Sequence, residues 1–520
     1  MTSLYRNFLN VGGLTLGSRI LGFVRDALVA AVLGTGPAAD AYLAAFRFPN
    51  LFRRLFAEGA FNTAFIPLFA KALEQQGPEP ARLLAARIMS WLVLVVTVVT
   101  VLVEIFMPWV MAPFVPGFLD DPAKYDLTVL LTRICFPYLM CMSLMAAYAA
   151  ILNGLGHFKA AAFAPILLNI VMIVFMAPLV LWPNTDVQTA IWIAIGTIAG
   201  GIAQLALVYA AIGRAGFVPK LRWPKFDAEV QRFWILAIPA VIAGGITQVN
   251  IFVGTIIASS ADSAIAYLYY ADRLYQLPLG IIGIAVGTVL LPELSRHLKG
   301  GRDKEADASQ NQALLISMLL SMPAATALIA LAQPIVTVLF ERGAFSASDS
   351  MQTAQTLIWF SAGLPAYVLI RVLQPGFFAR EDTKTPTIFA GISVLINVVL
   401  SLALFPSLAH VGIAIATSVA AWANAVLLAI WLARRQHFAL SAADWRKHGL
   451  IVVASLTMAA ILWGLSFPLA PYLTSTAPLL VQIVVLGVVV TAGMLVYFAL
   501  VHVTGAQPMG QLLRRLRRGG

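Results

Sequence analysis

Charged residues are scarce in this sequence. Asp, Glu, Lys and Arg together make up 11% of its 520 residues, whereas hydrophobic residues make up 60%. Soluble domains carry about 25% charged residues, so this composition excludes a large soluble enzyme held by one anchor. A membrane-spanning helix needs about 20 apolar residues, and roughly 12 to 14 such helices with short loops would fill the chain. The sequence therefore leaves no room for a separate soluble catalytic domain.

Residues that build metal or redox sites are also few. The two cysteines, Cys135 and Cys141, lie in one apolar segment, and their spacing does not match a CxxC metal or redox motif. They are expected to be buried small apolar residues. The 6 histidines are scattered, and no HExxH motif occurs, so no metal and no cofactor are predicted. A membrane-embedded enzyme, such as a glycosyltransferase or a lipid phosphatase, is one hypothesis for the function. Turnover of a lipid diphosphate to a new product would favour it.

Apolar runs separated by charged or Pro/Gly-rich loops predict an all-α polytopic membrane protein with fourteen transmembrane helices. Residues 91–103 are continuously apolar rather than alternating, which favours helices over a membrane β-barrel. No cleavable signal peptide is predicted, because Arg19 and Arg25 interrupt the first apolar stretch. The expected helices are 8–33, 38–70, 88–112, 126–152, 160–182, 188–212, 233–258, 263–295, 311–340, 351–378, 386–405, 409–433, 449–468 and 477–502.

The basic residues of the loops agree with this count of helices. With the N-terminus in the cytoplasm, 24 of the 34 Lys and Arg residues fall in cytoplasmic segments, and only Lys124 and Arg342 fall on the opposite side. Cytoplasmic loops carry an excess of Lys and Arg, so both termini are predicted to be cytoplasmic. The net charge of +11 is therefore assigned to loops that face anionic lipid, not to a nucleic-acid partner.

An internal repeat predicts two lobes. Ala41-Tyr42-Leu43 recurs as Ala266-Tyr267-Leu268, and with the same offset Pro67 matches Pro292. The shift equals six helices, so the halves keep one orientation and form a parallel pseudo-repeat with a substrate site between them. Chance similarity between apolar helices is the alternative explanation. The expected divisions are 1–225 for the N-terminal lobe, 226–440 for the C-terminal lobe, and 441–520 for two extra helices with a basic tail.

Eight basic residues fall inside the predicted helices. An arginine at the bilayer centre costs roughly 2.5–3.5 kcal/mol on insertion scales, so these side chains must face protein or water. Arg54 and Glu58 are four positions apart and could form a structural pair. Arg25 precedes Asp26, and Asp272 precedes Arg273; adjacent helical residues point apart, so neither is predicted to be an intrahelical pair. Arg47 can snorkel to the membrane surface, and Arg133 and Arg371 can be shallow structural residues.

The four arginines that remain predict a site for an anion. Arg19, Arg25, Arg53 and Arg273 exceed the nearby acids in number. A guanidinium group forms bidentate hydrogen bonds with phosphate and keeps its charge in a low dielectric. Ser18 lies seven positions before Arg25, on the same helix face. Pro49 precedes Asn50 and is expected to bend its helix.

Several motifs carry a family resemblance. They are Ser18-Arg19-Ile-Leu-Gly-Phe-Val-Arg25-Asp26, Ala39-Asp40-Ala41, Phe48-Pro49-Asn50-Leu-Phe-Arg53-Arg54, Phe56-Ala57-Glu58-Gly59-Ala60-Phe61, Tyr269-Tyr270-Ala271-Asp272-Arg273 and Gly287-Thr288-Val-Leu-Leu-Pro292. Together they resemble the MurJ (MviN) family of lipid II flippases, in the multidrug/oligosaccharidyl-lipid/polysaccharide exporter superfamily. The resemblance covers nearly the whole chain. It implies fourteen helices, arranged as two six-helix lobes plus two extra helices.

The resemblance also implies a function. Its members move lipid II, an undecaprenyl-diphosphate-linked disaccharide-peptide, from the inner to the outer leaflet of the bacterial cytoplasmic membrane by alternating access. The required cavity arginines of the family map by motif onto Arg19, Arg25, Arg53 and Arg273, and Ser18 matches a polar cavity position. Asn50 matches a second polar cavity position. The possible supporting residues of the site are Asp26, Asp40, Arg54, Glu58 and Asp272. The segments 449–468 and 477–502 match the proposed groove for the lipid tail.

Two features bear on the alternatives. A drug or cation antiporter of the same superfamily would be expected to have acidic residues in its cavity, and the dominance of arginine argues against it. Some family members have a sodium site built from acidic residues of the seventh and eleventh helices. Here these helices offer Gln248, Asn250, Asn397 and Ser401 but no acidic residue. Hard cations favour carboxylate oxygens, so sodium coupling of that kind is not expected.

Overall fold

The computed structural model describes residues 3–54, 61–182 and 184–506, and within them the chain is helical without β-strands. The predicted all-α class is therefore confirmed. The chain forms two compact units. Unit 1 is Met1–Ala266 together with Gly343–Phe345, and unit 2 is Tyr267–Arg342 together with Ser346–Gly520. Each unit is described separately below.

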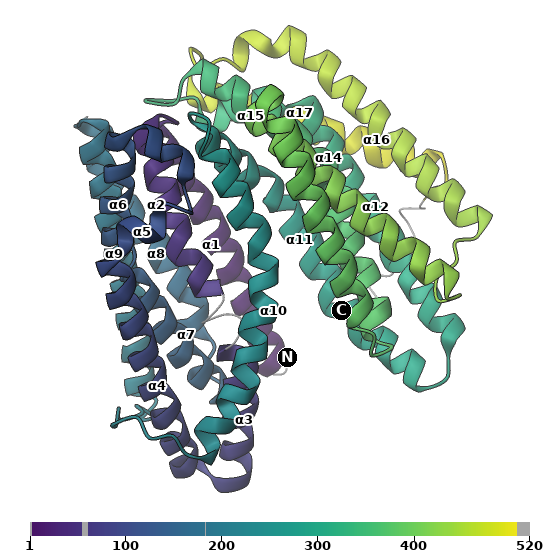
Figure 1. Cartoon of the computed structure of the whole chain (residues 1–520). Coiled ribbons are helices and arrows are strands. Elements are labelled where there is room, and N and C mark those ends of the chain that lie inside the picture. Colours follow the sequence, from purple (N-terminus) through teal and green to yellow (C-terminus); the bar gives the residue numbers. More distant parts are fainter. Residues whose placement is uncertain (1–2, 55–60, 183, 507–520) are drawn as a thin grey trace. The chain divides into compact units, whose positions relative to one another are not determined.

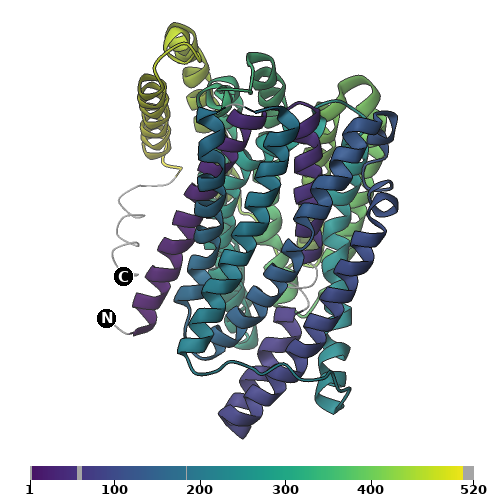
Figure 2. The same cartoon turned by 90° about the vertical axis from the view of Figure 1, so that its left-hand side faces the viewer.

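Unit 1 is a bundle of long helices that run roughly along one direction (Figures 1 and 2). Among its closely packed neighbours are α1 with α8, α8 with α9, and α2 with α6. Its elements are α1 (Ser3–Leu33), α2 (Pro37–Arg53), α3 (Asn62–Gln76), α4 (Pro78–Ile105), α5 (Met107–Met111), the 3₁₀ helix η2 (Pro116–Asp120), α6 (Pro122–Cys135), α7 (Tyr138–Gly154), α8 (Lys159–Leu181), α9 (Asp186–Arg214) and α10 (Ala228–Ala258).

Unit 2 contains the remaining helices. The last two, α16 and α17, pack against α12 and each other. The elements are α11 (Ala264–Lys299), whose first three residues belong to unit 1, α12 (Asp303–Ala330), α13 (Ala332–Phe340), α14 (Ala347–Phe378), α15 (Lys384–Arg434), α16 (Ala442–Leu469), the 3₁₀ helix η3 (Ala470–Tyr472) and α17 (Leu479–Val503).

The element α15 is two helices joined at a sharp break. Ala409 has non-helical dihedral angles of φ 44° and ψ −129°, three residues after Pro406. The Ser393 hydroxyl donates to the carbonyl of Ala420 at 2.8 Å, a contact that requires the two halves to lie side by side. The structure therefore has two antiparallel helices at the positions predicted from the sequence, 386–405 and 409–433.

The other predicted segments also coincide with helices or with pairs of consecutive helices. The segment 126–152 is interrupted at Pro137, between α6 and α7, and 311–340 is interrupted at Leu331, between α12 and α13. Within the part of the chain that the structure describes, nine helices are long and apolar enough to cross a membrane. The total of fourteen crossings stays a prediction.

The helix α10 groups with unit 1, although the sequence repeat places it in the second lobe. Arg47 on α2 donates to the Thr255 hydroxyl on α10 at 2.9 Å. Phe114 also packs on Phe252 with their ring centroids 5.1 Å apart. These contacts explain the grouping. The lobe boundary at residue 225 rests on the repeat alone and stays a prediction.

Each unit has its own core. In unit 1, Phe48 packs against Phe114 and Phe136, with centroid distances of 5.1 and 5.7 Å. In unit 2, Met458 of α16 and Tyr497 of α17 belong to one buried cluster. Large aromatic side chains bury much area, and their tilted and edge-on contacts add to that burial. In unit 1 this core holds α2, the helix that carries Asn50 and Arg53.

Candidate functional site

Arg25 on α1 is almost fully buried and is paired with its neighbour. Its Nε and Nη2 groups donate to Oδ1 of Asp26 at 3.0 and 2.7 Å, and its Nη1 donates to Oδ1 of Asn169 at 3.1 Å. The expectation that Arg25 and Asp26 do not pair is wrong. Helical spacing fixes where Cβ atoms point, but a long arginine side chain can fold back to an adjacent carboxylate. With both groups buried, that pairing offsets the cost of removing two charges from water.

Asn169 joins α8 to α1 at this point. Its Nδ2 donates to the backbone carbonyl of Ser18 at 3.0 Å, while its Oδ1 accepts from Arg25. A Cβ atom at Gly22 would lie 3.5 Å from Nδ2 of Asn169, so the amide lies directly against the helix. Asn169 contacts Ser18 through its backbone carbonyl, so the predicted shared face of the Ser18 and Arg25 side chains stays a prediction. Asn169 was not assigned to the site, although a lone asparagine in an apolar helix was the available signal.

On α2, Asn50 links the backbone to Arg53. Its Nδ2 donates to the carbonyl of Phe46 at 2.7 Å, and its Oδ1 accepts from Nε of Arg53 at 3.1 Å. Pro49, one residue earlier, lacks an N–H and interrupts the local ladder. Asn50 therefore adds a side-chain hydrogen bond next to Pro49 and orients the half-buried Arg53.

Three further predicted residues can be placed only in part. Arg19 is half-buried on α1, and Arg54 is exposed just after α2. Glu58 lies outside the described residues, so its proposed pairing with Arg54 stays a prediction. The roles of Arg19 and Arg54 in the site stay predictions.

In unit 2, Asp272 and Arg273 make contacts in different directions. Asp272 accepts a hydrogen bond from the side-chain amide of Gln276. Arg273 places its guanidinium over the ring of Tyr269, 4.6 Å from the centroid, and donates from Nη2 to the Tyr269 hydroxyl at 3.1 Å. A planar guanidinium is well suited to such stacking. Tyr269 thus orients Arg273.

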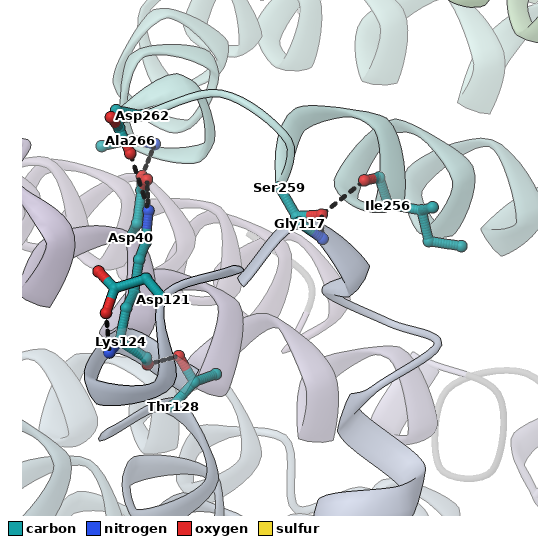
Figure 3. A network of polar contacts seen from close by, with 9 residues as sticks. All are labelled: Asp40, Gly117, Asp121, Lys124, Thr128, Ile256, Ser259, Asp262 and Ala266. Carbon is teal, nitrogen blue, oxygen red and sulfur yellow. Dashed lines mark hydrogen bonds and ion pairs between the residues drawn. The ribbon is translucent and has the colours of Figure 1, made fainter. Parts of the chain in front are cut away.

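Asp40 is the fully buried centre of a polar network at one end of unit 1 (Figure 3). Its Oδ2 lies 3.0 Å from Nζ of Lys124, at the start of α6, and its Oδ1 accepts from the backbone N–H of Ala266 at 3.0 Å. Lys124 is 5% exposed and also lies 4.2 Å from the ring centroid of Phe118. The pair therefore ties α2, α6 and the first turn of α11 together.

A second contact holds the same connection to α11. The backbone N–H of Gly117 donates to Oγ of Ser259 at 3.0 Å, and that hydroxyl donates to the carbonyl of Ile256 at 2.7 Å (Figure 3). A Cβ atom at position 117 would lie 2.4 Å from the Ser259 carbonyl oxygen, so only glycine fits. Asp40 was predicted as a possible supporting residue, and its contacts are structural. Its lysine partner was missed, because Lys124 was assigned to an outer loop.

Some of the predicted site residues are therefore in contact with one another or share a contact partner. Within unit 1, Arg25 and Ser18 meet through Asn169, and Asn50 meets Arg53. Arg273 belongs to unit 2. The convergence of the arginines on one pocket stays a prediction.

Within the described ranges, no group of three or more His, Cys, Asp or Glu residues is placed so that it could hold a metal ion. Oδ1 of Asn397 accepts from Ser401 at 3.3 Å and from Thr417 at 3.4 Å. This cluster of neutral groups cross-links the two halves of α15.

Comparison with known proteins identifies the family. The family described as "Lipid II flippase MurJ" matches residues 29–497. A protein of Rhizobium tropici named "Probable lipid II flippase MurJ" is 48% identical over 520 residues, which cover 99% of this chain and 97% of that protein. The chain belongs to the MurJ family. It is thus a multi-pass membrane protein of that family.

Solved structures agree with this membership. The structure described as "Lipid II flippase MurJ, inward closed conformation" matches with a TM-score of 0.75 and 27% identity, covering 95% of this chain and 98% of that one. A multidrug resistance MATE family transporter of the MOP superfamily matches with a TM-score of 0.67 and 15% identity, covering 80% of this chain and 94% of that one. The second likeness shows a shared fold alone. The resemblance to the MurJ family is thus confirmed.

Proposed function

We propose that this chain moves lipid II from the inner to the outer leaflet of the bacterial cytoplasmic membrane by alternating access. The observation that carries the proposal is the end-to-end similarity to a protein named as a probable lipid II flippase, at 48% identity over 99% of this chain. Both termini would lie in the cytoplasm, as the distribution of loop charge indicates. The chain would perform no covalent chemistry.

The arginines supply a physical reason for an anionic head group. Arg53 is oriented by Asn50, and Arg273 is oriented by Tyr269. Pre-oriented guanidinium groups can replace the hydration of a diphosphate as it leaves water. Arg19 would add a third positive charge. Arg25 is already neutralised by Asp26, so we assign it the task of holding the α1–α8 contact beside the substrate path.

The hydrocarbon tail would remain in lipid next to α16 and α17 while the head group crosses. A membrane potential of 100 mV is worth about 2.3 kcal/mol for each charge moved through it. That energy can act on the diphosphate or on the arginines of the protein. The proposal requires only that the bound head group move between two accessible states.

Leaflet-resolved detection of lipid II after acute depletion of the protein tests the proposal. Lipid II should accumulate in the inner leaflet, and the wild-type chain should restore its arrival in the outer leaflet. Arg53→Glu and Arg273→Glu should fail to do so while reaching the membrane in normal amounts. Arg446→Glu, at an exposed position on α16, is the charge-matched control and should restore transport. Normal transport by both cavity variants would refute the assigned roles, and normal transport after depletion would refute the function.

A further inference from the structure

The connection between α9 and α10 contains a short segment in which cations alternate with large apolar residues. Residues 220–226, called the basic strap below, read Lys-Leu-Arg-Trp-Pro-Lys-Phe. The strap lies outside regular secondary structure. Pro224 and the preceding Pro219 oppose helix formation, because proline lacks an N–H and restricts the residue before it. The segment therefore does not form a helix.

The backbone of the strap is fixed to α4. The N–H of Arg222 donates to the hydroxyl of Ser90 at 3.0 Å, and the carbonyl of Lys225 accepts from Nε1 of Trp91 at 3.0 Å. Both contacts use main-chain atoms of the strap, so they leave its cationic side chains available. The two anchors lie on adjacent residues of α4 and fix the strap in one register.

The two flanks of the strap are held as well. Before it, Nη2 of Arg82 donates to the carbonyl of Gly216 at 2.9 Å. After it, Nη1 of Arg87 lies 2.9 Å from Asp227 and 3.1 Å from Glu229 at the start of α10. The connection is thus held to α4 along its length. Figure 2 shows it crossing the lower ends of the unit 1 helices on the side that faces the viewer.

Fixing the backbone in this way presents the side chains outward. Trp223 is 88% exposed, Phe226 63% and Leu221 54%. Lys220 and Lys225 are exposed as well. A loop that only had to carry positive charge would gain nothing from exposing three large apolar residues to water. This combination suits a surface that is apolar and anionic at once.

We propose that the basic strap binds the head groups of anionic phospholipids in the leaflet nearest to it. Tryptophan is enriched where a membrane meets water, and basic segments near the surface gain about 1 kcal/mol for each Lys or Arg beside anionic lipid. The backbone is already ordered, so binding does not have to order a flexible loop. Because the strap is tied to α4 and α10, lipid binding would anchor these two helix ends together. The inference goes beyond transport of lipid II and does not depend on it.

Native mass spectrometry of the full-length protein in detergent tests this. The protein is titrated with phosphatidylglycerol and, separately, with phosphatidylcholine. The combined variant Lys220→Gln, Arg222→Gln and Lys225→Gln should weaken binding of phosphatidylglycerol about tenfold or more and leave phosphatidylcholine unchanged. A higher salt concentration should reduce the difference between the wild type and the variant in affinity for phosphatidylglycerol.

A matched variant removes the same charge elsewhere. Arg296, Lys299 and Lys304 are exposed cations around the connection from α11 to α12, and their combined replacement by Gln should change binding of phosphatidylglycerol less than about twofold. Trp223→Ala should weaken binding of both lipids by a smaller factor. If the two triple variants lost affinity for phosphatidylglycerol equally, binding would depend on total positive charge and not on the basic strap. That result would overturn the proposal. An unchanged affinity in the strap variant would also overturn it, and would point to a cytoplasmic protein as the partner.

Discussion

Tyr497 on α17 donates its hydroxyl hydrogen to the backbone carbonyl of Leu319 on α12, 2.8 Å away. Leu319 precedes Pro323 by four residues, and proline has no N–H with which to complete the helical bond. The tyrosine, 1% exposed, therefore satisfies the carbonyl that the proline leaves without its helical donor. The contact explains how α17 docks where Pro323 leaves a gap in the hydrogen-bond ladder of α12.

Tyr497→Phe should destabilise the protein by about 1–3 kcal/mol, because it leaves a buried carbonyl without a donor while keeping the ring. The measurement is the unfolding equilibrium of purified protein in mixed micelles. Tyr472→Phe removes the hydroxyl of a residue that is 52% exposed and should change stability by less than about 0.5 kcal/mol. Equal effects of the two variants would show that the bond to Leu319 contributes nothing.

The Arg25–Asp26 pair should behave as a buried unit. Arg25→Gln and Asp26→Asn should each cost about 3 kcal/mol, because each leaves one buried charge uncompensated. The double variant should cost clearly less than the sum of the two, with a coupling of at least about 1 kcal/mol. The Arg302–Glu305 pair, 3.0 Å apart and about half exposed, should couple by less than about 0.5 kcal/mol in the same cycle. Additive losses at Arg25 and Asp26 would contradict the pairing.

Asp40 should protect the backbone at the start of α11 from solvent exchange. Asp40→Ala removes the acceptor for the N–H of Ala266 and leaves Lys124 without its closest carboxylate. Hydrogen–deuterium exchange of a peptide that covers Ala266 should therefore be at least about tenfold faster. Asp262→Asn serves as the control, because its side chain is 99% exposed and 3.8 Å from Lys124. If exchange of this peptide were unchanged in Asp40→Ala, Asp40 would not stabilise the start of α11.

The helices could be predicted from the sequence because membrane crossing leaves few choices. The element α15 spans 51 residues, and the sequence predicted two helices there. A segment of that length cannot cross a bilayer of about 30 Å once, and Pro406 lies where the break is needed. Breaks inside one crossing, such as the one at Pro137, have no such length constraint and were missed.

The candidate site was predictable in its residue types but not in its partners. An arginine in an apolar helix must meet a polar group, which made Arg25 and Arg53 recognisable. The partners Asn169 and Lys124 come from helices far along the chain, and no spacing rule relates such positions. The Arg25–Asp26 contact was excluded by a rule about helix faces that does not limit a long side chain.

Gly343 should tolerate no side chain. It has a φ of 59°, and a Cβ atom there would lie 2.1 Å from the carbonyl oxygen of Ala31, which accepts from the N–H of Ala344 at 2.8 Å. Gly343→Ala should therefore cost about 1–2 kcal/mol for its backbone conformation and about 1–3 kcal/mol more for the overlap. Gly156→Ala shares the positive φ but has open space around it, so it should show only the first cost. Equal thermal shifts in the two variants would disprove the close approach.

His437 should make stability depend on pH. It lies between α15 and α16, where burial lowers its pKa below the usual 6.5, and Arg380 and Arg435 lower it further. Asp303 and Asp307 act in the opposite direction. The folded protein therefore keeps this imidazole neutral at a pH where the unfolded chain already binds a proton. Stability contributed in this way is present above about pH 6.5 and is lost as the pH falls toward the folded pKa.

The measurement is the apparent melting temperature of purified protein between about pH 7.5 and pH 5.5. It should fall with pH in the wild type, and His437→Gln should reduce that slope, because glutamine takes up no proton in either state. His157→Gln removes a histidine that is exposed between α7 and α8, and it should leave the slope as in the wild type. If His437→Gln kept the full slope, the loss of stability in acid would have to come from other groups, and the environment formed by Arg380 and Arg435 would not govern this histidine.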